Sequence, residues 1–277
     1  MNPDRYAITF ACYNQVEYTR QCVDSLLRHG VDPSRLVIVD NASQDDTRAY
    51  LDTLPLAPEG RIYNKTNFGC GVAWNQGVTA LQAEWTVVMN NDVIVSAGWL
   101  DNLIDTAERN GLKIISPSLI EGPLDYDFDE FAASASAKMA DTVRHGARHA
   151  VCMAIHESVW RDVGLFRATP KLLGYEDTIF FHEAEQVGVL CGMTGASWLH
   201  HFGSITVTAM KQERGLAGKQ GLGGRRNYRL LQQSWLQRKL AKLARVRQGE
   251  RWREEELAKF GFTMHGERAD KAFVWKA

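Results

Sequence analysis

The chain has 277 residues, of which 45% are hydrophobic and 23% are charged, and its formal net charge is −1. This composition is typical of a globular α/β protein and excludes a disulfide-rich miniprotein and a disordered chain. We find no signal-peptide pattern, no run of 18 apolar residues that could span a membrane, and five widely spaced cysteines without a C-x-x-C pair. We therefore expect a cytoplasmic protein with reduced thiols.

The small net charge hides a strong asymmetry. Residues 211–277 contain 17 Lys and Arg against 7 Asp and Glu, whereas residues 1–210 contain 15 against 26. An acidic body with a basic tail indicates a cation-using site in the body and a polyanion or a membrane as the partner of the tail. We therefore divide the chain into a main domain, residues 1–210, and a C-terminal extension, residues 211–277.

Short apolar runs alternate with helical patterns along the main domain. The apolar runs predict strands at residues 7–11, 36–39, 61–64 and 85–89, and the spacing between them predicts helices at 15–28, around 47–51 and at 69–83. This alternation is typical of βαβ units around a mainly parallel sheet. Ligands of such sheets bind beyond the carboxyl ends of the strands, where Asp40 and residues 90–92 fall.

Two motifs of other enzyme classes begin in this sequence and then fail. Gly69-Cys70-Gly71 could open a dinucleotide-binding fingerprint, but Trp74 occupies the place of its third glycine. His182-Glu183 could open a zinc-protease motif, but Gln186 replaces the second histidine. A P-loop and a hydrolase nucleophile elbow are absent from the sequence.

Six segments together resemble glycosyltransferase family 2, whose members have the GT-A fold. In chain order they are Ile8–Asn14, Val37–Thr47, Asn67–Gly77, Val88–Val93, Gly174–Asp177 and His200–Thr206. Each motif alone is weak, but the six follow one another in the family's order. The resemblance implies a Rossmann-like, mainly parallel sheet flanked by helices, and a metal-dependent, inverting transfer of a sugar from a nucleotide diphosphate donor. The basic tail is expected to add a helical C-terminal extension.

The first three segments supply the nucleotide-sugar site that the resemblance implies. In similar enzymes the Asp of a V-D-N-x-S segment bonds to the base or the ribose, and this role falls to Asp40. The alternative is that Asp40 only caps the following turn, as Asp often does. The other residues assigned to the site are Ala11, Cys12 and Tyr13 around the base, Asn67 at the base, Gly71 where a helix approaches the ligand, and Asn75 near the sugar.

Asn90-Asn91-Asp92 occupies the place of the family's D-x-D motif. A hard divalent ion, Mn²⁺ or Mg²⁺, would neutralise the departing diphosphate, with Asp92 as its anionic ligand. Because Asn90 replaces the first acidic residue, we expect a weaker metal affinity, and Asn91 is assigned toward the ribose. The resemblance also implies one imidazole ligand, for which His201 is the first choice and His200 the second. The alternative is a strand-end turn without a metal.

The pair Glu176-Asp177 resembles the catalytic pair of inverting members of the family. The resemblance assigns Asp177 as the general base that takes the proton of the acceptor hydroxyl, and Glu176 to positioning and acceptor contacts. Adjacent carboxylates also raise each other's pKa, which suits a base near neutral pH. The frequent E-D-x-D form ends here in Ile179, so acceptor binding or sugar choice could differ. Both acidic residues would also be stabilised at a helix N-terminus.

Three further segments are less clearly predicted, and for two of them the sequence allows more than one structure or role. Residues 119–141 are acidic, aromatic-containing and irregular, which predicts either an acceptor loop or a solvated surface loop. In the extension, residues 215–224 contain five glycines and predict a mobile loop, and residues 225–253 predict a basic amphipathic helix. That helix either contacts an anionic membrane or a nucleic acid, or packs its apolar stripe on the acidic main domain.

The sequence thus favours a glycosyltransferase that moves a sugar from a UDP- or dTDP-sugar to a hydroxyl acceptor. The favoured acceptor is a bacterial-type surface glycan, free or lipid-linked, reached from the inner face of the membrane by peripheral contact through the basic tail. Nucleic acid is a less favoured partner. Two alternatives remain: a nucleotide-sugar-binding protein with weak turnover, given Asn90 and Ile179, and a sugar transferase that acts on DNA.

Overall fold

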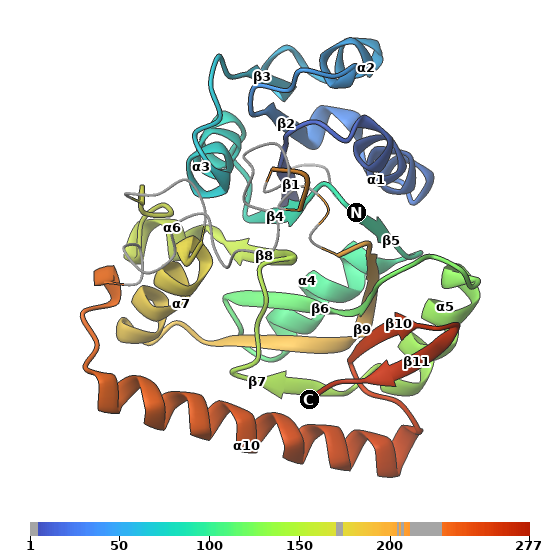
Figure 1. The fold of residues 1–277 in the computed structure, drawn as a ribbon, viewed down its shortest axis with the longest axis vertical. Coiled ribbons are helices and arrows are strands. Elements are labelled where there is room, and N and C mark those ends of the chain that lie inside the picture. Colours follow the sequence, from blue (N-terminus) through green and yellow to red (C-terminus); the bar gives the residue numbers. More distant parts are fainter. Residues whose placement is uncertain (1–4, 170–173, 204, 206–207, 211–228) are drawn as a thin grey trace.

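The computed structural model describes residues 5–169, 174–203, 205, 208–210 and 229–277. The first part of the chain alternates strands and helices (Figure 1). Its elements are β1 (Tyr6–Cys12), α1 (Val16–Arg28), β2 (Leu36–Asp40), α2 (Thr47–Thr53), β3 (Arg61–Tyr63), α3 (Cys70–Ala80) and β4 (Trp85–Asn90). These are the strands and helices that the apolar runs predict.

The second part mixes short strands, one long strand and four helices. Its elements are β5 (Val93–Val95), α4 (Trp99–Arg109), β6 (Ile114–Glu121), α5 (Phe128–Met139), β7 (Val143–His145), β8 (Cys152–His156), α6 (Glu157–Asp162), α7 (Glu176–Gln186) and β9 (Cys191–His201). The chain closes with α10 (Trp235–Phe260), β10 (His265–Ala269) and β11 (Ala272–Trp275). Among the described residues, none of the helices is long and apolar enough to cross a bilayer.

One sheet runs through the molecule in the order β11-β10-β6-β8-β4-β1-β2-β3, and β9 joins it by pairing with β5, β6 and β7. The strands β3, β2, β1 and β4 are parallel, as predicted, whereas β8 is antiparallel to both β4 and β6. The register places Cys12 beside Asp40 and Ala11 beside Asn90. The carboxyl ends of three strands therefore meet at one edge of the sheet.

Helices cover both faces of the parallel part, so its strands are buried on both sides. Along β4, Val87 and Met89 pack into the core that α1 and α4 share, while Val88 packs on the opposite face with Trp74 of α3. Strands that are buried on both faces show continuous apolar runs rather than alternation, which is why the sequence identified them.

Residues 119–141 are not the irregular loop that the sequence predicted. They end β6 and form α5, whose first turn is capped by the Asp127 carboxylate accepting from the Glu130 N–H at 2.9 Å. Phe131 packs at 5.3 Å from Trp198 and stacks at 5.2 Å on Phe273. The helix is held by aromatic partners about 70 and 140 residues later, which a local pattern does not reveal.

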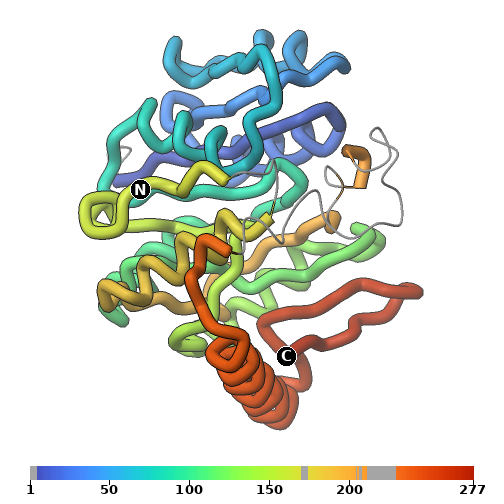
Figure 2. Tube along the Cα trace, turned by 60° about the vertical axis from the view of Figure 1, so that its left-hand side comes forward, coloured from blue at the N-terminus to red at the C-terminus, as the bar shows by residue number. Residues whose placement is uncertain are grey.

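The C-terminal segment is attached to the main sheet. β10 pairs in parallel with β6, and Arg144 of β7 forms a buried ion pair with Glu256 of α10 at 2.6 Å. α10 begins at Trp235 behind a capping box formed by Ser234 and Gln237. Figure 2 shows this helix at the opposite end of the molecule from α2. The glycine-rich residues 215–224 lie outside the described part of the chain.

Candidate active site

The aligned strand ends bring the predicted donor-binding residues to one edge of the sheet. Asp40 is fully buried, and both of its carboxylate oxygens bond within the protein. One oxygen accepts from the Ser43 N–H at 2.9 Å, as the turn-capping alternative expects, and the other accepts from Arg48 Nε at 2.6 Å. The Arg48 side chain is 45% exposed, so the side chain that faces solvent here is Arg48 and not Asp40.

The last residues of β1 and Tyr13, which follows the strand, differ in how much of their side chains is accessible. The Cys12 side chain is buried in the core, with its Sγ 3.7 Å from the Val39 carbonyl, and burial raises the pKa of this thiol well above its usual value. Ala11 and Tyr13 are half-buried beside it. The thiol of Cys12 is thus a core group, whereas Ala11 and Tyr13 remain partly accessible at this edge.

A network of amide side chains shapes the loop before α3. Asn41, which is buried, donates to the Asn67 Oδ1 at 2.9 Å and accepts from the Asn64 Nδ2 at 3.1 Å. Asn67 in turn accepts from the Gly69 N–H at 2.9 Å. The predicted base-contacting Asn67 is therefore fixed by Asn41, a residue that the sequence analysis did not single out.

The predicted sugar-side residues lie where α3 meets α7. The Asn75 amide donates to the Phe166 carbonyl at 2.7 Å and accepts from the Phe166 N–H at 2.9 Å, which clamps the chain after α6. A side chain on Gly71 would meet the Glu176 Cβ at 3.3 Å, so glycine permits this close approach. Asn91 is buried and donates to Thr19 of α1 at 2.9 Å.

Asp92 and His201 face one another at the strand end of the predicted metal site. His201 Nε2 lies 3.3 Å from Asp92 Oδ1 and 3.5 Å from Asn90 Nδ2. His201 Nδ1 lies 3.2 Å from Glu121 Oε1, and the other oxygen of Glu121 lies 2.9 Å from His265 Nε2. Four titratable side chains from four strand ends or turns thus form one continuous chain of contacts.

The electrostatics of this chain follow from its alternating charges. Burial lowers the pKa of His201, but the hydrogen bonds to Asp92 and Glu121 outweigh it and raise that pKa to about 9. The hydrogen bonds from His201 and then His265 hold the pKa of Glu121 well below its usual range. His201 is therefore held as an imidazolium between two carboxylates, where a divalent cation could supply the positive charge instead.

His200, the second choice for the metal, points to the opposite face of β9. It is fully buried, its Nδ1 lies 3.0 Å from the Tyr126 hydroxyl, and the ring of Phe202 packs 4.9 Å from its own. Burial lowers the pKa of His200 to about 4. Successive residues of a strand point to opposite faces, so only His201 reaches Asp92.

Glu176 and Asp177 begin α7, after two residues with positive φ, Gly174 at 106° and Tyr175 at 72°. The pKa of Glu176 is raised by burial and then by the neighbouring Asp177 charge, and its Oε2 has no partner among the described residues. The paired carboxylates thus differ: Glu176 is buried against α3, and Asp177 is half-buried at the edge of a cavity.

The half-buried Cys70 thiol lies at the start of α3 and is affected by the charges of three acidic side chains. Its pKa is raised to about 12, by burial first and then by the charges of Glu176, Asp177 and Asp92. The charges of two acidic motifs, 84 residues apart in the chain, therefore both act on the N-terminus of α3.

Comparison with known proteins decides the family. The model of glycosyl transferase family 2 matches residues 8–173, which is more than half of the chain. The chain belongs to glycosyltransferase family 2. The succinoglycan biosynthesis protein ExoO of Rhizobium meliloti is 29% identical over 114 residues, 40% of this chain and 33% of that protein. Glycosyltransferase GlyG of Streptococcus pneumoniae is 19% identical over 127 residues, 45% of this chain and 40% of that protein.

Solved structures show the same fold at low identity. S. aureus TarS 1–349 in complex with UDP-GlcNAc has a TM-score of 0.53 and 13% identity, over 72% of this chain and 61% of that one. GalNAc-T7 with UDP, GalNAc and Mn²⁺ has a TM-score of 0.55 and 13% identity, over 71% of this chain and 43% of that one. The predicted family and fold are thus confirmed, and the chain spans less than half the length of the curated relatives just named.

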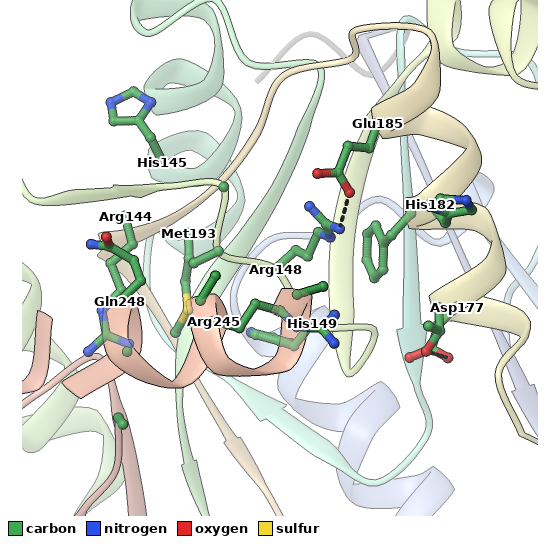
Figure 3. A pocket seen from close by; sticks show the side chains of 18 of the residues that line it. Arg144, His145, Arg148, His149, Asp177, His182, Glu185, Met193, Arg245 and Gln248 are labelled. Carbon is green, nitrogen blue, oxygen red and sulfur yellow. Dashed lines mark hydrogen bonds and ion pairs between the residues drawn. The ribbon is translucent and has the colours of Figure 1, made fainter. Parts of the chain in front are cut away.

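In this family 2 protein, a cavity of about 1000 Å³ lies between the body and α10. Figure 3 shows Asp177 and His182 of α7 on one side of it and Arg245 and Gln248 of α10 on the other. His265, the last member of the contact chain that begins at Asp92, also lines the cavity. The predicted base therefore lines the cavity directly, whereas Asp92 and His201 are connected to it only through Glu121 and His265.

Besides Asn41, three residues of this site were not predicted: Arg48, Glu121 and His265. Glu121 ends β6 opposite His201, and His265 begins β10, 144 residues after Glu121. Arg48 reaches Asp40 from the first turn of α2. Only the pairing of β6 with both β9 and β10 brings the first two together, and no motif in the sequence marks that pairing.

Proposed function

We propose that this chain transfers a sugar from a uridine diphosphate sugar to a hydroxyl of a surface glycan, with inversion at the anomeric carbon. The observation that carries the proposal is the close packing of Glu176, beside Asp177, on Gly71 at the start of α3, at the carboxyl edge of a family 2 sheet where Asp92 follows β4. The UDP-bound states of TarS and GalNAc-T7 support a uridine donor over dTDP. The partial similarity to a succinoglycan biosynthesis protein supports a surface glycan as acceptor.

Asp92 and His201 are the residues that would hold Mn²⁺ or Mg²⁺. No group of three or more His, Cys, Asp and Glu suited to a metal occurs within the described ranges, so the diphosphate and water would complete the coordination. Glu121 lies at His201 Nδ1, which leaves Nε2 facing Asp92 and free to coordinate. The donor set therefore fits a cation, which when bound would neutralise the charge that develops on the diphosphate.

The remaining steps belong to the protein's own residues. Asp177, at the edge of the cavity, would take the proton of an acceptor hydroxyl as that oxygen attacks the anomeric carbon. Glu176, buried against α3 with a raised pKa, would hold the acceptor or the sugar by hydrogen bonds. One base and one in-line displacement leave no covalent sugar–enzyme intermediate, so the configuration inverts.

The test compares Asp177→Asn with the wild-type protein and with Asp141→Asn, an exposed acidic control. We expect Asp177→Asn to lower transfer by roughly 10²–10⁴-fold, the usual contribution of a general base, while UDP-sugar still raises the melting temperature in the presence of Mn²⁺. Glu176→Gln should lower transfer less, and Asp141→Asn should leave it unchanged.

Release of UDP from a panel of UDP-sugars, with product configuration read by NMR, gives the rate and the stereochemistry. A near-normal rate for Asp177→Asn, or a retained configuration, would show that the assigned base is wrong. Donor binding by the wild-type protein without any release of UDP would instead identify a binding protein that has lost turnover.

A further inference from the structure

The first half of α10 carries apolar side chains that contact no core. Residues 235–249 contain five Lys and Arg and no Asp or Glu. The exposed apolar side chains are Trp235 at 66%, Leu236 at 56%, Leu240 at 57%, Leu243 at 45% and Val246 at 52%. The packing of this stripe on the main domain, one of the alternatives from the sequence, therefore does not occur.

The stripe lies on the outer side of the helix. At about 100° per residue, these five apolar residues fall within an arc of roughly 140°. The residues that line the cavity toward the body, among them Ala241, Arg245, Gln248 and Trp252, fall on the opposite side. Figure 1 shows α10 along the outer edge of the molecule, below β7.

The buried contacts of α10 lie in its second half, and the chain is also held to α7 just before the helix begins, where Leu231 is buried and Gln233 lies 3.3 Å from His182. Glu256 bonds to Arg144, and Gly249 lies against Ala277, where an added Cβ would be 3.3 Å away. These are also the positions at which α10 is buried. The first half therefore runs between two attachment points, and its outer side presents apolar and basic side chains to the solvent.

We propose that this outer face of α10 docks on the surface of an anionic lipid bilayer. Lys239 and Arg247 fall within the arc of the apolar stripe and Lys242 at its edge, and Lys239 Nζ lies 5.1 Å from the centre of the Trp235 ring. A helix with apolar and aromatic residues beside Lys and Arg binds by burying its apolar face at the headgroup level while its cations meet anionic lipids.

The charge of this face argues against a dimer in which the same face of a second copy packs on it. Two such faces would bring together ten Lys and Arg with no Asp or Glu between residues 235 and 249, and like charges repel. A nucleic acid backbone would use the cations but would leave the leucines in water. The bilayer is the partner that satisfies both kinds of side chain.

The test measures co-sedimentation with vesicles of phosphatidylcholine alone and of phosphatidylcholine with 30% phosphatidylglycerol. We expect the wild-type protein to bind the anionic vesicles and not the neutral ones. Leu240→Ser with Leu243→Ser should abolish this binding. The triple change Lys239→Gln, Lys242→Gln, Arg247→Gln should weaken it about a hundredfold, because each basic residue near an anionic surface contributes about fivefold.

Two matched control variants distinguish binding through this face from binding caused by the net charge or by exposed apolar side chains elsewhere. Arg20→Gln, Arg109→Gln and Arg161→Gln remove the same charge from exposed positions of the body. Val187→Ser with Leu190→Ser removes two other exposed apolar side chains, which are 55% and 60% exposed. Both controls should bind anionic vesicles as the wild-type protein does, and all variants should keep its melting temperature.

Three results would overturn the proposal. The first is a wild-type protein that does not sediment with anionic vesicles. The second is equal vesicle binding by the Leu240→Ser, Leu243→Ser variant, together with binding of duplex DNA that only the charge changes abolish, which would indicate nucleic acid. The third is a stable dimer, seen by light scattering, that these two serine substitutions convert to a monomer.

Discussion

Arg144 and Glu256 form the ion pair that fastens α10 to the sheet. Arg144 Nε and Nη2 donate to the two carboxylate oxygens at 2.6 and 2.8 Å, and the side chains are 4% and 5% exposed. Glu256 also accepts from the Met264 N–H at 2.8 Å. Arg144→Met keeps an apolar stem at this position but leaves the buried carboxylate with that single donor.

The loss of stability in Arg144→Met comes from the Glu256 carboxylate, which stays buried without its partner. Removing one partner of a buried ion pair typically costs about 3–5 kcal/mol, because the other charge is left uncompensated. We expect the lower end, about 3 kcal/mol, since Met264 preserves one charge-assisted hydrogen bond. That is a large fraction of a total stability of roughly 5–15 kcal/mol. Adding Glu256→Gln removes the orphaned charge and keeps an acceptor for Met264, so the double variant should be more stable than Arg144→Met.

Urea unfolding of the single and double variants gives these free energies. Arg161→Met, which breaks an exposed pair with Asp162, is the control and should change stability by less than about 0.5 kcal/mol. A loss below about 1 kcal/mol for Arg144→Met, or a double variant no more stable than the single one, would refute the idea that an uncompensated buried charge sets the cost.

Three further changes probe other parts of the structure. Glu121→Gln should lower Mn²⁺ affinity about 10–100-fold, because it weakens the partner that orients His201, and calorimetry with UDP and Mn²⁺ would show equal affinity if that orientation were irrelevant. Gly77→Ala should destabilise the protein by about 1–3 kcal/mol in urea unfolding, since the new Cβ overlaps the Thr9 hydroxyl and lies 2.7 Å from its Cβ; wild-type stability would mean that Thr9 simply moves aside. The pKa of His200 lies at about 4 when folded against about 6.5 when unfolded, so the unfolded state binds its proton first and stability falls as pH drops from 6.5 toward 4. His200→Phe should remove roughly 2 kcal/mol of the loss between pH 7 and pH 5, and an unchanged pH dependence in urea unfolding would show that His200 does not cause it.

The parallel half of the fold was predictable because its signals are local. Strands such as β1 and β4 are mostly apolar and buried along their length, and turn residues separate them from helices. The second half gave weaker signals. α5 depends on rings that come from residues 198 and 273, and β10 depends on pairing with β6, so their stabilising partners lie far away in the sequence. Such contacts are invisible to any reading based on local periodicity.

The same distinction explains which site residues the sequence revealed. Asp92, Glu176 and Asp177 stand in short motifs whose order is characteristic of the family, so a single sequence points to them. Glu121 and His265 belong to no motif, and they join His201 only because β6 pairs with β9 on one side and β10 on the other.

α10 is a third case. Its composition predicted an amphipathic helix, but the sequence did not predict which way the apolar face points. The apolar and basic residues of the first half of this helix predicted an amphipathic surface, and the sequence allowed that surface to face either the body or the outside. The anchoring of Gly249 and Glu256 decides between them, because it turns Trp235 and Leu240 away from the sheet. An amphipathic pattern shows that a helix needs a partner, whereas the points at which the helix is fixed determine which side that partner approaches.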